Sequence, residues 1–161
     1  GVAEARSGEQ QHSFNFPFQL TRLPPSLLAK LPPDAKQDSA QDCQRYQVSV
    51  RPGDLVLLFT DGFRDNLHEH EALAVIEDLL LSQGVGADDR SKGLGACLGL
   101  PRPQLVAQRL ASTAQGRSVD PRAAVPFLDS ARQYGYEFPL GGKEDDITVV
   151  AAWVLPRASA A

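Results

Sequence analysis

Two apolar runs are the clearest feature of the hydrophobic pattern. The first is Leu-Val-Leu-Leu-Phe-Thr at residues 55–60, and the second is Ile-Thr-Val-Val-Ala-Ala-Trp-Val-Leu at residues 147–155. Runs that are apolar on both faces are typical of buried central strands rather than of hairpin edges. If these two strands are antiparallel neighbours, the end of the first meets the start of the second.

Weaker periodicities predict the remaining elements. Residues 14–20 indicate a strand that Pro17 interrupts, and residues 44–50 alternate apolar and polar side chains as a half-buried strand does. The tight turn after residue 50 predicts an antiparallel hairpin between strands 44–50 and 55–60. Apolar spacing predicts helices over 69–82, 104–114 and 124–134, with long connections over 21–43 and 83–101 and a frayed tail after Pro156.

The order of these elements, three strands, then helices, then a last strand, predicts an α+β fold with helices on one face of an antiparallel sheet. The chain has 161 residues, of which 42% are hydrophobic, enough for one domain with a sizeable core. Its net charge of −4 and pI near 5.3 argue against a dominant nucleic-acid surface. Its apolar runs are shorter than the roughly 18 residues that span a bilayer.

Acidic residues gather at the ends of the two apolar runs. Asp61 follows the first run in a Thr-Asp-Gly turn, and Asp145 and Asp146 precede the second. One Asp-Gly turn alone indicates little, because Asp bonds its own backbone and Gly accepts a positive φ. Several carboxylates at the edge of a buried sheet are unfavourable unless a cation neutralises them. Antiparallel pairing would bring both turns within reach of one ion, so the sequence predicts a metal site.

Other candidate motifs indicate structure rather than chemistry. Cys43 and Cys97 lack a Cys or His at ligand spacing and are expected to be reduced thiols, and no covalent nucleophile motif surrounds them. His12 is expected to be a structural hydrogen-bond partner. The His-Glu-His-Glu sequence at 68–71 is expected to form the solvated first turn of a helix rather than a zinc site.

Two glycine-rich stretches, residues 93–99 and 141–143, lack the spacing of nucleotide-binding loops. The acidic turns also lack the alternating acidic loop of an EF-hand, which leaves a simple calcium-binding module as a weaker alternative.

Several motifs together resemble the metal-dependent Ser/Thr protein phosphatases of type 2C (PPM-type), in particular their mitochondrial and plastid branch. The matching stretches, in the family's order, are Gln10-Gln11-His12 with 14–20, then 53–67, then Asp120-Pro121-Arg122 with Pro126-Phe127, and finally Gly141-Gly142-Lys143 with 145–149. The resemblance implies part of an α-β-β-α sandwich with antiparallel sheets. Residues 1–156 would be the C-terminal part of the phosphatase domain, and residues 157–161 a disordered tail.

The resemblance also implies a function. Such an enzyme hydrolyses phosphomonoesters on phosphoprotein substrates with a water activated by two Mg²⁺ or Mn²⁺ ions, and the branch implies a soluble mitochondrial or chloroplast protein. The family's bridging Asp lies in an N-terminal half that we do not find upstream of Gln10. We therefore expect the 161-residue chain to need that half, to be inactive alone, and to leave an apolar strand face uncovered. The alternative is a non-catalytic fragment or pseudophosphatase that binds proteins.

Carried over by position, Asp61 and Asp145 resemble metal ligands of the family. Asp146 stands where many members carry Asn, and we expect it to support the site by hydrogen bonding rather than to bind the ion. Gly62 belongs to the same turn as Asp61, and two further residues, Asp65 and Asn66, are expected to brace that turn rather than to bind metal directly. No side chain of this sequence is assigned as a catalytic group, and none of the arginines inherits the phosphate-binding role.

Overall fold

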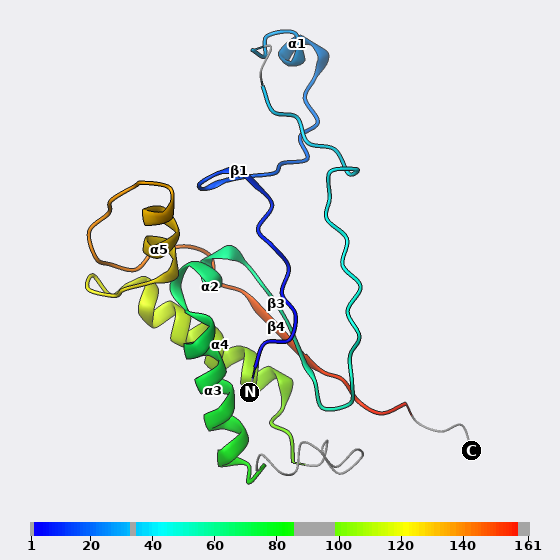
Figure 1. Cartoon of the computed structure of the whole chain (residues 1–161), viewed down its shortest axis with the longest axis vertical. Helices are drawn as coiled ribbons and strands as arrows, with labels where there is room; N and C mark the ends of the chain where they lie inside the picture. Colours follow the sequence, from blue (N-terminus) through cyan, green and yellow to red (C-terminus); the bar gives the residue numbers. More distant parts are fainter. Residues whose placement is uncertain (1, 33–34, 86–98, 158–161) are drawn as a thin grey trace. The chain divides into compact units, whose positions relative to one another are not determined.

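The computed structural model describes residues 2–32, 35–85 and 99–157 (Figure 1). The chain divides into two units, one of residues 5–48 and one of residues 1–4 with 49–161, and each is described by itself. The expectations that lie outside the described residues in whole or in part include the connection over 83–101, the state of Cys97, the glycine-rich stretch up to residue 98, and the tail from residue 158.

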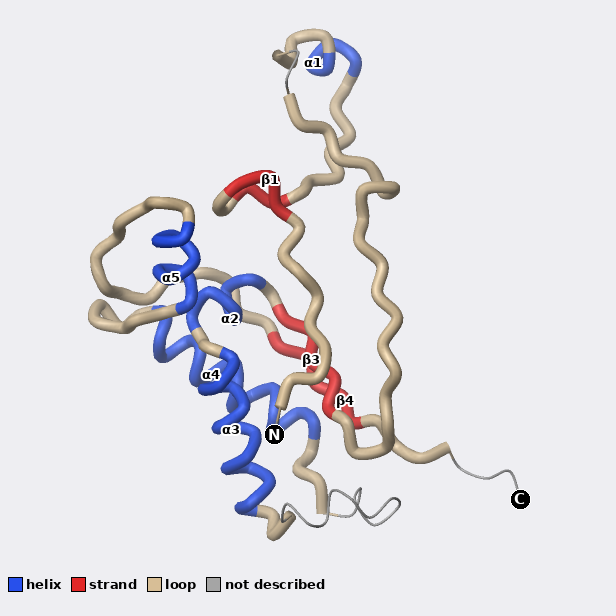
Figure 2. The backbone as a smooth tube through the Cα atoms, viewed as in Figure 1, coloured by secondary structure: helices blue, strands red, loops and turns tan. Residues whose placement is uncertain are grey.

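Two antiparallel strands form the sheet of the larger unit, β3 (Leu55–Phe59) and β4 (Val149–Trp153) (Figure 2). In their register Phe59 pairs with Val149, so the end of β3 meets the start of β4. Past the other end, the Gly53 N–H donates to the Val154 carbonyl at 2.9 Å. The expected antiparallel pairing of the two apolar runs is confirmed.

Four helices belong to the same unit: α2 (Asp61–Asn66), α3 (Glu69–Ser82), α4 (Pro103–Ser118) and α5 (Pro126–Gln133). The three helices that the apolar spacing predicts are confirmed. Helix α4 ends later than predicted, and both α4 and α5 begin at a proline, whose fixed φ suits a first helical position. The short helix α2 was not predicted, because its Asp-Gly start is typical of a turn.

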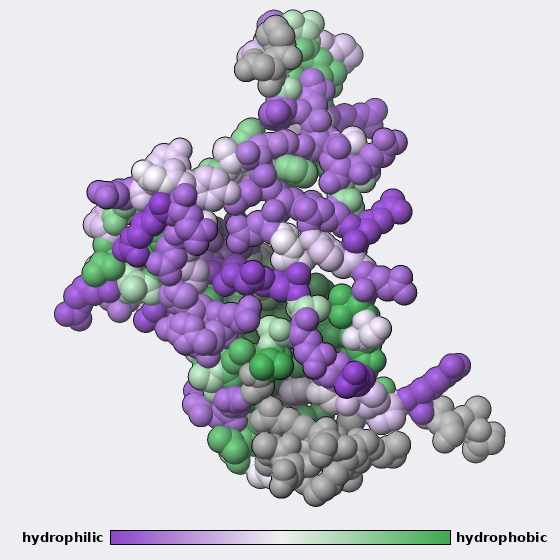
Figure 3. Space-filling model, in the orientation of Figure 1, coloured by the Kyte–Doolittle hydropathy of each residue, from purple (hydrophilic) through white to green (hydrophobic). Residues whose placement is uncertain are grey.

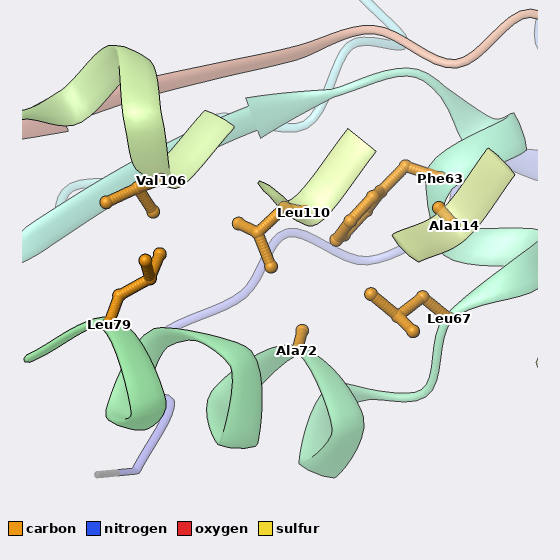
Figure 4. Close-up of a cluster of buried hydrophobic side chains, with 7 residues drawn as sticks. All are labelled: Phe63, Leu67, Ala72, Leu79, Val106, Leu110 and Ala114. Carbon is orange, nitrogen blue, oxygen red and sulfur yellow. The ribbon is translucent and has the colours of Figure 1, made fainter. Parts of the chain in front are cut away.

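The main hydrophobic core lies between α2, α3, α4 and one face of the sheet. Figure 4 shows side chains from these helices and from Leu67, the residue after α2, pointing toward one another: Phe63, Leu67, Ala72, Leu79, Val106, Leu110 and Ala114. Alternate strand residues, among them Leu57 and Ala151, pack against this cluster. Trp153 joins it and donates its indole N–H to the Pro101 carbonyl at 2.8 Å. The packing of helices on one face of the sheet follows the predicted α+β arrangement.

The opposite face of the strand pair is apolar and exposed. Its residues include Val56, Leu58 and Val150, with exposed fractions of 42%, 67% and 55%. Hydrophobic side chains, in green, are visible at the surface in Figure 3. The pattern alone predicted strands buried on both faces, but in the structure only the face toward the helices is covered. This outcome matches the expectation for the chain by itself.

The smaller unit, residues 5–48, contains the hairpin β1 (Gln11–Ser13) and β2 (Phe16–Pro17) and the one-turn helix α1 (Pro25–Leu28). The strand expected over 14–20 is therefore wrong in extent, because the chain reverses at Asn15, whose φ of 54° forms the turn. His12 Nε2 lies 2.9 Å from Asp38 Oδ1, and the His12 ring stacks on Phe18. The structural role expected for His12 is confirmed.

The strand expected over 44–50 is wrong. No strand forms there, and the apolar side chains of its alternating pattern, Tyr46, Val48 and Val50, are all more than half exposed. An alternating pattern produces a strand only where a hydrogen-bonded neighbour and an apolar surface are available. In the part of the chain that the structure describes, β3 pairs with β4 and not with this segment.

Candidate metal centre

The side chain of Thr60 joins the end of β3 to the start of β4. Its Oγ1 donates to the Asp146 carbonyl at 2.8 Å and accepts from the Thr148 N–H at 2.9 Å. The Thr60 N–H also donates to the Thr148 carbonyl at 3.1 Å. These bonds fix Thr60, and with it the next residue, Asp61, beside the residues before β4. The proximity that strand order predicted thus has a specific structural cause.

Helix α2 places a second carboxylate beside the first. Asp61 is the first residue of α2, and Asp65 follows it by four positions, which is about one helical turn. Residues at this spacing lie on the same face of a helix. The Asp-Gly pair at 61–62 is typical of a turn, so the sequence predicts a bracing role for Asp65 and not its position on the same helix face as Asp61.

Asn66 ties α2 to the loop that carries the third carboxylate. Its side chain is fully buried. The Asn66 Nδ2 donates to the carbonyls of Gly62 at 2.8 Å and Lys143 at 2.7 Å, and its Oδ1 accepts from the Lys143 N–H at 2.8 Å. Two of the three bonds reach across to Lys143, so Asn66 holds the loop before Asp145 against α2.

The three carboxylates of Asp61, Asp65 and Asp145 form one acidic cluster. One oxygen of each lies within 4.8 Å of the others, and it is the one group of this kind among the described residues. Asp61 and Asp145 are exposed and Asp65 is partly buried, so a cation from solvent can reach the oxygens. Anionic oxygen ligands suit hard divalent cations such as Mg²⁺ and Mn²⁺.

Lys143 lies on two of these carboxylates. Its Nζ is 2.5 Å from Asp65 Oδ2 and 2.7 Å from Asp145 Oδ2, and 5.2 Å from the centre of the Phe127 ring. Desolvation lowers the pKa of Lys143, but its hydrogen bonds to Asp145 and Asp65 outweigh this effect, and the net pKa is raised. The ammonium is therefore charged at neutral pH. The sequence reasoning missed this role, although a basic residue two positions before Asp145 was a signal for it.

The two carboxylates on Lys143 differ in their protonation behaviour. Burial raises the pKa of Asp65 above its ordinary value, more than the hydrogen bond from Lys143 lowers it. The more exposed Asp145 has a lowered pKa, first because it accepts from Lys143 and then because it accepts from the Asp146 N–H. The negative charges of Asp61 and Asp145 also disfavour ionisation of Asp65. The cluster is thus crowded with like charge, which a divalent cation would relieve.

Gly62 and Asp146 determine how closely the two segments approach. A Cβ on Gly62 would lie 2.6 Å from the Asp146 carbonyl oxygen and 3.0 Å from the Asp145 Cβ. Only a residue without a side chain permits this approach. The structure therefore brings together the predicted residues Asp61 and Asp145, with Gly62 and Asn66 as packing and bracing partners. Asp146 takes part through its backbone, whose carbonyl accepts from Thr60 and whose N–H donates to Asp145.

The His-Glu-His-Glu sequence begins helix α3, as expected. His68 precedes the first residue of the helix, and Glu71 accepts from the His68 N–H at 3.0 Å in a capping box. The His68 ring also bonds the carboxylates of Glu71 and Asp129, each at 3.1 Å. These contacts are those of a helix N-terminus.

Comparisons with known proteins find similar phosphatases. The chain is 38% identical over 148 residues to a protein named "Protein phosphatase PTC7 homolog fig" from Drosophila virilis. It is 32% identical over 149 residues to "Probable protein phosphatase 2C 55" from Arabidopsis thaliana. Its structure is similar to the X-ray structure of the photosystem II phosphatase PBCP, with a TM-score of 0.62 and 26% sequence identity. No protein-family profile matches the chain.

The matches cover nearly all of this chain but half or less of the matched proteins. The Drosophila match covers 91% of this chain and 41% of the relative, and the Arabidopsis match covers 92% and 26%. The match to the PBCP structure covers 92% of this chain and 50% of that protein. These matches support a type 2C (PPM-type) phosphatase, of which the chain corresponds to a C-terminal part. The mixed helix and antiparallel-sheet fold agrees with this family. Among the described residues, no helix is both long and apolar enough to cross a membrane.

Proposed function

We propose that this chain supplies one carboxylate side of the metal site of a protein serine/threonine phosphatase. The observation that carries the proposal is the convergence of Asp61, Asp65 and Asp145 from two distant segments, in a chain whose relatives are phosphatases. Residues 1–156 would then be the C-terminal part of one phosphatase domain, and the remaining residues a tail.

Asp61 and Asp145 are the proposed ligands of the ion. Each has a side chain exposed enough to meet a hydrated cation, and each has an oxygen close to the other. Asp65 lies in the same cluster and is a further candidate ligand, while Asp146, Gly62 and Asn66 support the arrangement. Mg²⁺ or Mn²⁺ fits three carboxylates, because both cations prefer oxygen ligands and retain several waters. Two ions are proposed for the complete site.

Ions held there would lower the pKa of a bound water and stabilise charge on the phosphoryl oxygens. The residues of this chain would do the positioning. Thr60 and Asn66 fix the two segments, and the carboxylates of Asp61 and Asp145 would bind the cation. Since Asp145 has a lowered pKa, it remains ionised at neutral pH. No covalent enzyme intermediate is required by this scheme.

The proposed substrates are proteins phosphorylated on serine or threonine, and the proposed location is the mitochondrion or the chloroplast. Both follow from the family rather than from a contact in this chain. The N-terminal half of such a domain would supply the remaining ligands.

The test is Asp61→Asn in a full-length protein that contains this chain. Turnover of a small aryl phosphate at saturating Mn²⁺ should fall more than about 100-fold, since even residues that only support metal ligands are worth 10–100-fold. Asp78→Asn is the matched control, because Asp78 is an exposed residue of α3 and should retain full activity. Unchanged turnover for Asp61→Asn would refute the assignment.

A further inference from the structure

Lys143 lies on two of the three carboxylates that would hold a divalent cation. The Lys143 ammonium lies 2.5 Å from Asp65 Oδ2 and 2.7 Å from Asp145 Oδ2, and both carboxylates belong to the three-member acidic cluster. A magnesium-sized ion binds carboxylate oxygens at about 2.0–2.1 Å. An ammonium and such an ion cannot both lie against this pair of oxygens, because their positive charges would repel at contact distance.

The position of Lys143 is built into the fold. Its backbone N–H and carbonyl are both bonded to the buried side chain of Asn66. Its own side chain is only 23% exposed, and the ring of Phe127 lies beside the ammonium at 5.2 Å. These contacts distinguish Lys143 from a surface lysine that meets a carboxylate by chance, since such pairs contribute little and exchange freely with solvent.

We propose that Lys143 is an internal competitor for the metal ion, whose ammonium must leave Asp65 and Asp145 before a divalent cation binds both. The inference rests on the proposed function, because it concerns the same carboxylates, and it adds a regulation of that site. Lys143 keeps the carboxylates neutralised at low metal concentration and raises the concentration of cation needed to fill the site. Without the ammonium, the apo cluster is less stable and the metal binds more tightly.

The experiment measures Mn²⁺ binding to the full 161-residue chain by isothermal titration calorimetry, for wild type, Lys143→Met and Lys143→Arg. Lys143→Met should lower the Kd at least about tenfold, the effect expected when even one charge-assisted hydrogen bond no longer opposes the ion. Lys143→Arg keeps a charge that can bond both carboxylates and should leave the Kd at or above the wild-type value. Lys30→Met is the control for net charge, because Lys30 is exposed in the other unit and should change nothing.

Two further readouts separate competition from general electrostatics and from misfolding. The gain in Lys143→Met should persist in about 0.5 M KCl, where charges beyond direct contact are screened. The apo Lys143→Met chain should melt at a lower temperature than wild type and gain more from Mn²⁺. Lys143→Gln is a second neutral replacement that keeps a polar side chain. It should show the same tighter Mn²⁺ binding, and it serves as the test if Lys143→Met fails to fold.

The outcomes distinguish this inference from the proposed function. Equal or weaker Mn²⁺ binding in both Lys143→Met and Lys143→Gln, with binding lost in Asp61→Asn, would overturn the role of Lys143 and leave the metal site standing. A gain that disappears in high salt, or that Lys30→Met reproduces, would overturn it as well. If Asp61→Asn binds Mn²⁺ as wild type does, the proposed metal site itself is wrong.

Discussion

Replacing Asn66 by alanine should destabilise the chain strongly, although Asn66 contacts no proposed ligand side chain. Asn66 is fully buried and makes three side-chain hydrogen bonds of 2.7–2.8 Å, one to Gly62 and two to the backbone of Lys143. Each such bond contributes about 1 kcal/mol net, so the expected loss is about 3 kcal/mol. That loss is a large share of the roughly 5–15 kcal/mol that stabilises a typical domain.

The assay is urea unfolding followed by far-ultraviolet circular dichroism. The midpoint should fall while the slope stays constant, since the surface exposed on unfolding hardly changes. Asn66→Asp should also destabilise, because its second oxygen would face the carbonyls of Gly62 and Lys143 instead of donating to them. Gln108→Ala, at an exposed position of α4, is the control and should stay within about 0.5 kcal/mol of wild type. A loss below about 1 kcal/mol for Asn66→Ala would refute the bracing role.

Three further predictions follow from the same region and from helix α3. Asp145→Asn should raise the Mn²⁺ concentration needed for activity far more than Asp146→Asn does, and equal effects in a metal titration would show that the two carboxylates are wrongly assigned. Gly62→Ala should lower the free energy of unfolding by about 1–3 kcal/mol, because its Cβ would meet the Asp146 carbonyl at 2.6 Å; unchanged urea unfolding would contradict this. Burial raises the pKa of Glu71, but the hydrogen bonds from His68 outweigh the effect of burial, so the net pKa lies below its ordinary value of 4.5. The stability that ionised Glu71 contributes is therefore present above pH 4.5 and is lost as the pH falls below that value. The difference in urea unfolding between wild type and Glu71→Gln should therefore be largest near pH 7 and should shrink as the pH falls well below 4.5, and a constant difference would disprove the linkage.

The strand pair and the acidic turns could be predicted because both depend on local sequence. Short apolar runs that contain β-branched and aromatic residues and adjoin turn residues favour strands over helices. The order of Asp61 after one strand and Asp145 before the other then determines which edge they share. The helices with clear apolar spacing, such as Glu69–Ser82, were also predictable. The metal role of these carboxylates stays a prediction.

The remaining features depend on tertiary contacts that no local pattern encodes. Helix α2 is six residues long with Gly62 near its start, and its burial of Phe63 and Asn66 stabilises what propensity alone would not. Because that helix was missed, so was the one-turn spacing that places Asp65 beside Asp61. For residues 44–50 the error is the opposite one: the alternating pattern predicts a strand, but in the part of the chain that the structure describes this segment has no hydrogen-bonded neighbouring strand.

The most direct test of the metal centre is the position of a bound ion. Crystals of the chain, or of a full-length protein containing it, would be soaked with Mn²⁺ and measured for anomalous scattering at the manganese edge. We expect a peak within about 2.5 Å of carboxylate oxygens of both Asp61 and Asp145, with the Lys143 ammonium displaced from Asp145. A manganese peak elsewhere, with Lys143 still bonded to Asp65 and Asp145 at saturating Mn²⁺, would contradict the account.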